Sequence, residues 1–456
     1  MELVRQTPEE LETQKEMILQ MKWSLFLFLC PDKPWQHPID VQFQNGQHLS
    51  QFEHGEIHCF NHVWTFGENV EKLPAELEVF PFNTKQYTDQ RGWYRPFLGD
   101  HISYRYQIDA VIGEGGYGRI LQCTDKGRFD EKKVAIKIKK QRQQYLYNET
   151  LILLQIHICD PENTYNCLHL LDFDMFRGHH YLVFDLYSMD LDTYIRRYPH
   201  TLTINKVAVM SKSILVALDF LRRCDIIHAD VKPANILVDL NNVNQLKLGD
   251  FGLSVFVKDA KRYGLFQTRF WRAPESFCRG CPTTSMDMWS FALMLPEMLT
   301  GHHFLHGETS SDQFHLILQI LGMPTENFFC DSLDSLRYFK KTTQIIKREE
   351  YYPRHCIPLR DLRTGKITYQ VNRKLHRVPL RRQPPGATPL SAIFAHPGLA
   401  KLGNLMEQIL KWDHGKRLRP WHALHHAFFT EASEYQDDFV NCAGAIAHLR
   451  SFKDQL

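Results

Sequence analysis

Apolar and polar residues are spaced with two different periodicities along this chain. Between Tyr106 and Asp185 short apolar runs predict, in order, strand, turn, strand, strand, helix, strand, strand. Longer helical spacings follow, over Lys206–Cys224 and Ser285–Thr300. Strands that precede helices in this way are typical of an α+β protein, so we expect a two-lobed body with an antiparallel sheet in its first lobe and mostly helices in its second.

The flanking segments carry weaker patterns. A capping Thr, a Pro and two acids at 7–10 predict a helix running to about residue 22, and the alternation over 41–66 predicts a few small strands. Residues 72–99 form a connecting region by their turn signals, and the basic, proline-containing stretch 331–389 is expected to be an irregular surface insertion. These patterns divide the chain into an N-terminal accessory region (1–105), a main domain (106–429, with lobes 106–185 and 186–429) and a C-terminal tail (430–456).

Composition narrows the class of protein. The chain has 456 residues, 43% of them hydrophobic, and a net charge of +2, which offers no whole-chain electrostatic reason to expect a nucleic-acid or membrane partner. The apolar run Trp23–Cys30 is far shorter than the roughly 20 residues that span a bilayer. The 11 cysteines are odd in number and have no repeated spacing, which favours reduced thiols and an intracellular location, in the cytoplasm, the nucleus or both.

A glycine-rich turn lies between two apolar runs, at Gly113-Glu-Gly-Gly-Tyr-Gly118. Glycines allow backbone N–H groups to approach phosphate oxygens, although a purely structural hairpin is an equally good interpretation of this pattern alone. The next apolar strand ends in Lys137, whose ammonium would need an anionic partner if buried. Glu149, on a helical pattern, is the nearest candidate. A surface lysine beside Lys139 and Lys140 is the competing interpretation of Lys137.

The segment with the most chemical information is Ile226-Ile-His-Ala-Asp-Val-Lys-Pro-Ala-Asn-Ile-Leu-Val238. Asp230 can accept a hydrogen bond from an attacking hydroxyl, and Lys232 can neutralise charge on a transferred phosphoryl group. Asn235 offers a hard oxygen to a magnesium ion, and Asp250, in Asp-Phe-Gly, offers a carboxylate to the same kind of ion. These residue types fit phosphoryl transfer.

The motifs occur in one order: glycine loop, strand lysine, helix glutamate, catalytic loop, Asp-Phe-Gly and, at 273–275, Ala-Pro-Glu. This order resembles the protein-kinase signature set. The resemblance implies that Asp287 anchors the catalytic loop and that Arg417 pairs with Glu275. It also implies a nucleotide-binding set of Ile112, Gly113, Gly115, Gly116, Gly118, Ile120, Ala135, Lys137, Phe184, Asp185, Leu186 and Leu237.

Within the kinases the chain resembles the DYRK family of the CMGC group over about residues 76–429. The segments that carry this likeness are 99–106 before the glycine loop, Thr268-Arg-Phe-Trp-Arg-Ala-Pro-Glu275, and 352–356 with the basic stretch after it. They are closest to the second DYRK class, whose N-terminal accessory region is matched weakly at 78–82. The resemblance implies transfer of the ATP γ-phosphate to Ser or Thr hydroxyls of proteins with Mg²⁺ as cofactor, with dual specificity and a proline-directed preference as open possibilities.

Two positions depart from the family. Where its activation loop has Tyr-x-Tyr, this chain has Tyr263-Gly-Leu265, so a phosphate that would meet Arg269 and Arg272 cannot form at Leu265. Ala234 replaces a glutamate that supports arginine preference in related kinases. A catalytically silent scaffold is therefore the competing functional class, and a splicing-associated kinase type is a competitor within the enzymes.

Three further patterns have mundane alternatives. His54, His58 and His62 could chelate zinc, but a structural cluster is the better interpretation of their spacing. Cys278-x-x-Cys281 lacks a second pair and is better explained as loop cysteines. The basic run 373–382 could be a nuclear signal or a peptide-binding surface, although a solvated face is the simpler expectation.

Overall fold

The computed structural model describes residues 12–13, 16–18, 31–68, 70, 85–116, 118–141, 147–199, 201–263, 267–330, 334–342, 350–360, 367–372, 383–432 and 439–453. The chain divides into two compact units. The N-terminal unit comprises Arg5–Asn163 and Leu168–Tyr187, and the C-terminal unit comprises Thr164–Cys167 and Ser188–Leu456, with Met1–Val4. Each unit is described by itself.

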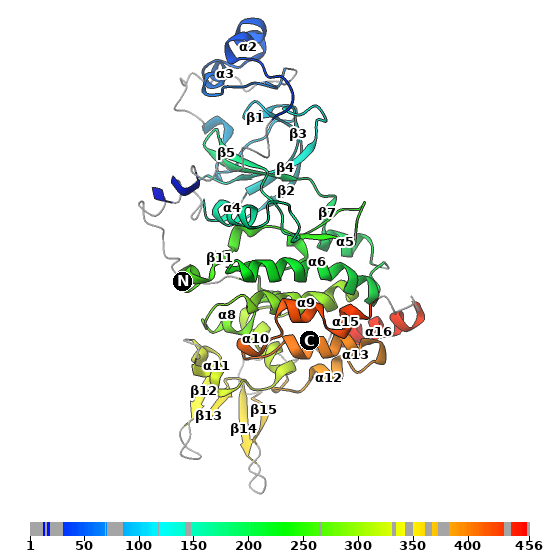
Figure 1. Cartoon of the computed structure of the whole chain (residues 1–456). Helices are drawn as coiled ribbons and strands as arrows, with labels where there is room; N and C mark the ends of the chain where they lie inside the picture. The colour runs from blue at the N-terminus through cyan, green and yellow to red at the C-terminus, as the bar shows by residue number, and fades with distance from the viewer. Residues whose placement is uncertain are drawn as a thin grey trace. The chain divides into compact units, whose positions relative to one another are not determined.

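The N-terminal unit is built on one antiparallel sheet of six strands, in the order β1-β2-β3-β4-β6-β5 (Figure 1). Its elements are β1 His101–Ile102, β2 Tyr106–Gly115, β3 Gly118–Asp125, β4 Lys133–Lys139, helix α4 Asn148–Cys159, β5 Asp172–Phe176 and β6 His179–Asp185. The order of strands and helix expected between residues 106 and 185 is therefore confirmed. Buried side chains that alternate along β2, β3 and β4, such as Ile108, Leu121 and Ile136, form the core beneath the sheet.

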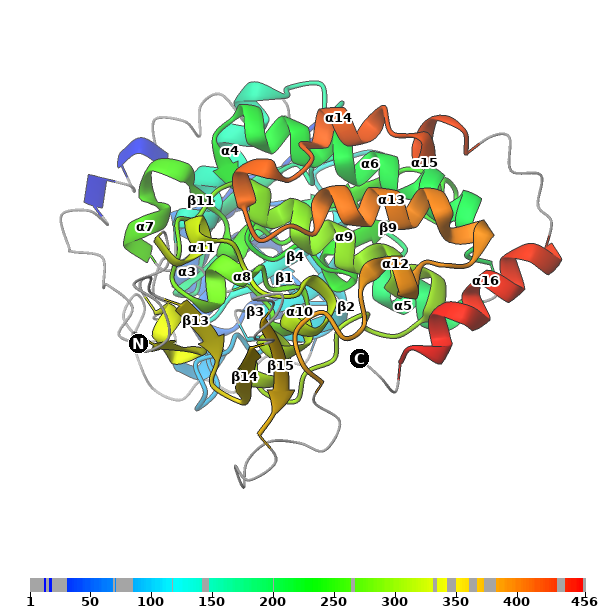
Figure 2. The same cartoon turned by 90° about the horizontal axis from the view of Figure 1, so that it is seen from below.

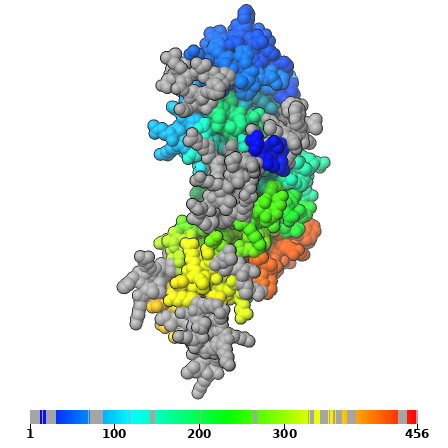
Figure 3. Space-filling view, turned by 90° about the vertical axis from the view of Figure 1, so that its left-hand side faces the viewer, coloured from blue at the N-terminus to red at the C-terminus, as the bar shows by residue number. Residues whose placement is uncertain are grey.

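Residues 38–48 and 51–59 are helical, so the prediction of small strands over 41–66 is wrong there. Helix α2 spans Pro38–Asn45 and α3 spans Gln51–Glu56, followed by 3₁₀ turns at Gly46–His48 and Ile57–Cys59. The Ser50 hydroxyl accepts from the Glu53 amide at 3.2 Å, and the Glu53 carboxylate accepts from the Ser50 amide at 2.9 Å. This capping box fixes the start of α3, and the apolar residues face a small core of their own. Figure 3 shows this segment, in blue, on the surface of the N-terminal unit.

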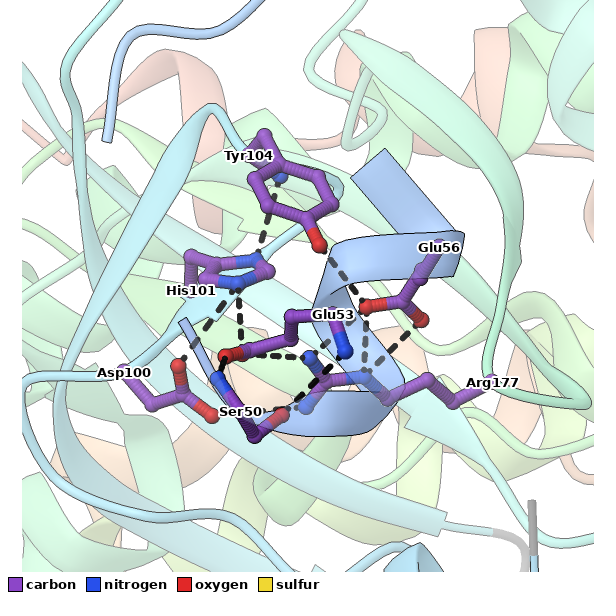
Figure 4. Close-up of polar contacts among 7 residues, drawn as sticks. All are labelled: Ser50, Glu53, Glu56, Asp100, His101, Tyr104 and Arg177. Carbon is purple, nitrogen blue, oxygen red and sulfur yellow. Dashed lines mark hydrogen bonds and ion pairs between the residues drawn. The ribbon is translucent and has the colours of Figure 1, made fainter. Parts of the chain in front are cut away.

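A buried ionic network joins α3 to the sheet (Figure 4). Arg177, in the turn between β5 and β6, donates to Glu56 at 2.9 Å, to Glu53 at 3.0 Å and to Asp100 at 3.3 Å, and its side chain is fully buried. His101 Nε2 lies 3.2 Å from Glu53, and the Tyr104 hydroxyl donates to Glu56 at 3.1 Å. Burial raises the pKa of Tyr104, which keeps this phenol a donor. Helix α3 is thus tied by charge to the turn between β5 and β6 of the six-stranded sheet.

The C-terminal unit is mostly helical (Figures 1 and 2). Its helices are α5 Leu191–Arg197, α6 Ile204–Arg223, α7 Ala260–Tyr263, α8 Pro274–Phe277, α9 Ser285–Thr300, α10 Ser310–Leu321, α11 Glu326–Cys330, α12 Leu390–Ile393, α13 Ala400–Ile409, α14 Pro420–Leu424, α15 Ala427–Thr430 and α16 Phe439–Ser451. Helix α9 is buried on all sides from Met286 to Leu299 and contacts α6, α13 and α16, as expected of a helix that is apolar all round. The two long predicted helices are confirmed as α6 and α9.

Short strands complete the C-terminal unit. Strands β7 Met189–Asp190, β9 Ile236–Val238 and β10 Leu246–Leu248 form one small sheet, and β8 Ile226–Ile227 pairs with β11 Val255–Phe256. The insertion predicted to be irregular contains two hairpins, β12 Phe339–Thr342 with β13 Glu350–Pro353 and β14 Cys356–Arg360 with β15 Ile367–Val371. These strands contain aromatic and β-branched residues, which favour strands. The prolines and basic residues around them obscured that signal in the sequence.

Several expectations fall partly or wholly outside the described residues. Residues 12–13 and 16–18 of the predicted N-terminal helix are helical, and the rest of it lies outside them. The segments 78–82 and 373–382 also lie outside them, as does Leu265. Across the ranges that are described, the search for a helix long and apolar enough to cross a membrane finds none.

Candidate active site

The glycine-rich turn is the hairpin between β2 and β3, where Gly115 pairs with Gly118. A Cβ added at Gly118 would lie 2.4 Å from the carbonyl oxygen of Ile138, so the close approach of β3 to β4 requires glycine there. A Cβ added at Gly115 or Gly116 would meet nothing within 4 Å. At these two positions the backbone is open to an approaching group, a feature that a phosphate-binding turn needs and that a structural hairpin also allows.

Lys137 lies on β4 and bonds to Glu149 of α4, with 2.7 Å between Nζ and Oε1. The exposed fractions of the two side chains are 10% and 4%, so the alternative of a surface lysine is wrong. Lys139, two residues along the same strand, lies 3.1 Å from Oε2 of the same carboxylate. The expected pair is therefore present, and it is joined by a second lysine that the sequence analysis treated only as a neighbour.

Most of the other residues of the predicted nucleotide set lie on strands of the N-terminal sheet. Ala135 of β4 pairs in register with Phe184 of β6, whose side chain is buried. Asp185 ends β6 and forms an ion pair with Lys132, and Leu186 follows it, half-buried. On the hairpin, Gly113 pairs with Ile120 and the side chain of Ile112 is half exposed, while Leu237 lies on β9 of the C-terminal unit.

The catalytic loop connects β8 to β9 and gathers its polar groups around Asp230. One carboxylate oxygen of Asp230 accepts from Lys232 Nζ at 2.6 Å and from Asn235 Nδ2 at 2.9 Å. The other accepts from the hydroxyl of Thr268, which also accepts from Lys232 at 3.0 Å. The loop and Thr268 thus bring together a carboxylate, an ammonium, an amide and a hydroxyl, and such groups can position and stabilise charge in phosphoryl transfer.

Asp287 of α9 anchors the backbone of the catalytic loop. Its two carboxylate oxygens accept from the backbone amides of His228, at 2.8 Å, and Ala229, at 2.9 Å. Ala229 has a φ of 65°, which an alanine adopts only when its surroundings hold it. Burial raises the pKa of Asp287 to about 7, against the two amides, which lower it. The anchoring role that the family resemblance assigned to Asp287 agrees with these contacts.

Asp250 begins the Asp-Phe-Gly turn with a φ of 56°, in the left-handed region. His228 Nε2 lies 3.0 Å from the carbonyl oxygen of Gly249, and the Gly249 amide donates to the Asn235 carbonyl at 2.8 Å. Burial lowers the pKa of His228, which favours a neutral ring that donates through Nε2 and accepts the Asp230 amide at Nδ1. These bonds tie the backbone beside Asp250 to the loop that carries Asn235.

The segment after the activation loop uses its arginines internally. Arg272 donates through Nε and Nη2 to the Gln267 carbonyl, at 2.9 and 2.7 Å, and burial lowers its pKa. Arg269 donates to the carbonyl oxygens of Gly307, at 3.2 Å, and Glu308. Tyr263 ends α7. Two arginines expected to meet a phosphate thus have backbone carbonyls as partners.

A buried ion pair joins the Ala-Pro-Glu turn to a later part of the C-terminal unit. The Arg417 guanidinium donates to both carboxylate oxygens of Glu275, at 2.6 and 2.7 Å, and both side chains are almost completely buried. The predicted pairing of these residues is present. It holds the Ala-Pro-Glu turn to the last helices of the unit through a two-point bond.

The residues of each unit fit the groups that the family resemblance implies. In the N-terminal unit, the open backbone at Gly115 and Gly116 and the buried ammonium of Lys137 suit a polyphosphate. In the C-terminal unit, the side-chain oxygens of Asn235 and Asp250 are of the hard type that divalent cations such as magnesium prefer. The donor set is therefore that of a nucleotide and a metal ion.

Three residues were missed by the sequence analysis. Thr268 entered only as the first residue of the segment 268–275, and Gln267 did not enter at all. Thr268 bonds to Asp230, and the buried side-chain amide of Gln267 accepts from the Ala273 backbone amide at 2.9 Å and donates to the Ser290 hydroxyl at 2.8 Å. Lys139 could have been found from strand alternation, because residues i and i+2 share one face.

The weaker candidates have structural explanations. His54 and His58 lie 3.1 and 2.8 Å from the side chain of Gln42, and the ring of His62 packs against Trp35 at 4.4 Å. Among the described residues, the only group of three or more His, Cys, Asp or Glu side chains close enough to share a metal ion is Glu53, Glu56 and His101, where Arg177 already supplies a cation. Cys278 is buried, which raises its pKa, and Cys281 is half-buried.

The comparisons with known proteins agree with this geometry. The model of the protein kinase domain matches residues 106–429. The chain is 30% identical over 422 residues to a putative dual specificity tyrosine-phosphorylation-regulated kinase 3 homolog of Drosophila melanogaster, covering 92% of this chain and 49% of that protein. It is also 30% identical over 393 residues to the dual specificity tyrosine-phosphorylation-regulated kinase mbk-2 of Caenorhabditis elegans (85% and 46%).

A mammalian relative is similar to the same degree. The dual specificity tyrosine-phosphorylation-regulated kinase 3 of Mus musculus is 30% identical over 401 residues, covering 87% of this chain and 66% of that protein. The chain spans about half the length of the fly and worm relatives. The match over residues 106–429, together with these relatives, shows that the chain belongs to the protein kinase family and resembles its dual specificity tyrosine-phosphorylation-regulated members, the DYRK kinases.

Proposed function

We propose that this protein is an active serine/threonine kinase that transfers the γ-phosphate of magnesium-bound ATP to hydroxyls of protein substrates. Membership of the kinase family implies ATP and a divalent metal ion in general. The observation that carries the proposal is the set of bonds around Asp230, where Lys232, Asn235 and Thr268 converge on one carboxylate.

Each group has a task in this reaction. Asp230 orients the attacking hydroxyl and accepts its hydrogen bond, while Lys232, 2.6 Å away, stabilises charge that develops on the transferred group. Asn235 and Asp250 would hold the magnesium ion, which supplies charge neutralisation at the phosphate oxygens. Lys137 would bind phosphate oxygens while bonded to Glu149.

The bond between Arg272 and the Gln267 carbonyl supports a proline-directed preference. That carbonyl accepts from the guanidinium at two points, so it is a poor acceptor for the amide of a substrate residue after the target hydroxyl. Proline has no amide hydrogen, so a substrate with proline at that position loses no hydrogen bond when this carbonyl is already occupied. We therefore expect proline at that position to be favoured over alanine in peptide substrates.

We further propose that activity does not require tyrosine phosphorylation in the activation loop. Leu265 cannot take a phosphate, and the guanidinium groups of Arg269 and Arg272 already have backbone carbonyls as acceptors. The segment can therefore be held without a phosphate to bridge the two arginines. Protein made in bacteria and treated with phosphatase should keep its activity. A large loss after treatment would contradict this part of the proposal.

A scaffold that only binds partners is the alternative function, and one experiment separates the two. Asp250→Asn removes a metal-binding carboxylate and should lower phosphate transfer to a basic protein by about a thousand-fold or more, since electrostatic groups at the reacting phosphate contribute on that scale. The exposed Asp130→Asn is the control and should leave transfer unchanged. Equal activity in wild type and Asp250→Asn would defeat the proposal, and wild type that binds ATP without transferring phosphate would favour the scaffold.

The remaining part of the proposal concerns location. We place the protein inside the cell, because the 11 cysteines show no disulfide-like spacing along the sequence. Cell fractionation with an antibody to the chain tests this, and recovery only from the secreted fraction would contradict it.

A further inference from the structure

We propose that Lys139 is a second positioning lysine of the nucleotide-binding strand. It holds Glu149 and helix α4 in place through Oε2, so that Lys137 shares the carboxylate through Oε1 and can turn to the phosphates without releasing the helix. This inference rests on the proposed function for its effect on ATP, whereas the contact between Lys139 and Glu149 can be tested without nucleotide.

The geometry divides one carboxylate between two lysines. Lys137 Nζ lies 2.7 Å from Oε1 of Glu149, and Lys139 Nζ lies 3.1 Å from Oε2. The exposed fractions of these side chains are 10% for Lys137, 3% for Lys139 and 4% for Glu149. At such burial an ion pair is little screened by solvent, and a lysine is seldom buried unless it is paired.

The register of the sheet explains why Lys139 can reach Glu149. Residues two apart on a strand face the same side, so Lys137 and Lys139 both point toward α4. Lys139 pairs directly with Gly118, while Lys137 pairs with Ile120. Gly118 is the residue directly opposite Lys139 on β3, and as a glycine it places no side-chain atoms next to Lys139 on that face.

The backbone of Lys139 is fixed as well. Its carbonyl oxygen lies 2.9 Å from Nδ1 of the buried His179, and its own strand β4 lies so close to Gly118 of β3 that a Cβ at Gly118 would collide with the Ile138 carbonyl. A lysine whose backbone and carboxylate partner are both fixed loses little further conformational entropy when it forms its ion pair. It is therefore suited to hold a helix.

The consequence concerns the moment when ATP binds. Lys137 alone would have to serve both Glu149 and phosphate oxygens, and any weakening of its bond to Glu149 would loosen α4. With Lys139 on the second oxygen, the helix stays attached to β4 whichever partner Lys137 favours. Helix α4 is thus expected to keep its place in the nucleotide-free protein.

The first experiment needs no activity. Amide hydrogen exchange of α4 (148–159) is compared in nucleotide-free wild type, Lys139→Met and Lys140→Met, the last being a matched loss of one charge on a half-buried neighbour. Lys139→Met should raise exchange in α4 about ten-fold, by loss of a bond to a charged group, while Lys140→Met should not. Equal exchange in α4 of both variants overturns the inference. If Lys139→Met does not fold, Lys139→Gln, which keeps a donor but not the charge, replaces it in the same comparison.

The second experiment follows ATP. Lys139→Met should raise the KM for ATP, and the Kd for Mg-ATP measured by thermal shift, by roughly three- to ten-fold with an unchanged KM for the peptide, and Lys139→Arg should restore most of the loss. A merely structural role would lower thermal stability without this selective change. An unchanged Kd for Mg-ATP in Lys139→Met overturns the inference. If wild type itself fails to bind Mg-ATP, the proposed function fails, and the exchange experiment still decides on Lys139.

Discussion

The replacement of Arg177 by methionine probes the ionic network that joins α3 to the sheet. Methionine has a similar length but no charge, so Arg177→Met leaves the carboxylates of Glu53, Glu56 and Asp100 buried without the guanidinium that now bonds to all three. The ring of Tyr87 also loses the cation 3.9 Å from its centroid. We expect this to be among the most destabilising single substitutions in the N-terminal unit.

The magnitude can be worked from the cost of neutralising one carboxylate. With an ordinary glutamate pKa near 4.3, keeping one buried carboxyl protonated at pH 7 costs about 4 kcal/mol, from about 1.36 kcal/mol per pKa unit. This agrees with the roughly 3–5 kcal/mol measured when one partner of a buried ion pair is removed. For a unit of this size the melting temperature should fall by roughly 10 °C.

The pH dependence carries a definite sign. In Arg177→Met the folded-state pKa of a buried carboxyl rises above its unfolded value, so the variant is relatively more stable where that group is protonated and loses stability as pH rises. The difference in melting temperature from wild type should therefore be larger at pH 8 than at pH 5. Arg91→Met, at an exposed arginine, is the control and should cost less than about 0.5 kcal/mol.

Thermal denaturation of both variants, followed by circular dichroism at the two pH values, tests this reasoning. A melting temperature of Arg177→Met equal to that of Arg91→Met would refute it, because the network would then add nothing to stability. The double variant with Glu56→Gln should be less destabilised than the sum of the single variants, since the two side chains share two bonds of 2.9 and 3.0 Å.

Two further substitutions follow from local geometry. Gly118→Ala should cost roughly 1–3 kcal/mol of stability, because its Cβ would lie 2.4 Å from a carbonyl oxygen of β4. Gly116→Ala, whose Cβ would meet nothing within 4 Å, is the control and should be tolerated. Equal melting temperatures of the two variants would contradict this prediction. Arg417→Met should cost roughly 3–5 kcal/mol by leaving Glu275 buried without its partner, while Lys416→Met, at an exposed lysine, should be nearly neutral in urea unfolding.

The chemistry of the site could be predicted from the sequence because its residues are close together in the chain. Asp230, Lys232 and Asn235 lie within six positions, and a loop that short brings their side chains together in any fold that keeps it compact. The alternation of β2 to β6 and the apolar faces of α6 and α9 were equally local signals. Helices α2 and α3 were not predicted, because the alternation over 41–66 indicated strands, whereas the local signal for a helix there is the capping box at Ser50.

The order of strands and helices between residues 106 and 185 and the residue types of the catalytic loop could be predicted from the amino-acid sequence, since both depend on near neighbours in the chain. That Lys139 shares Glu149 with Lys137, and that Arg177 meets carboxylates 77 to 124 positions away, became visible only in the folded structure. Which charged groups are buried together depends on how distant segments pack. Because solvent no longer screens such groups, their partners are set by that packing and cannot be read from local pattern.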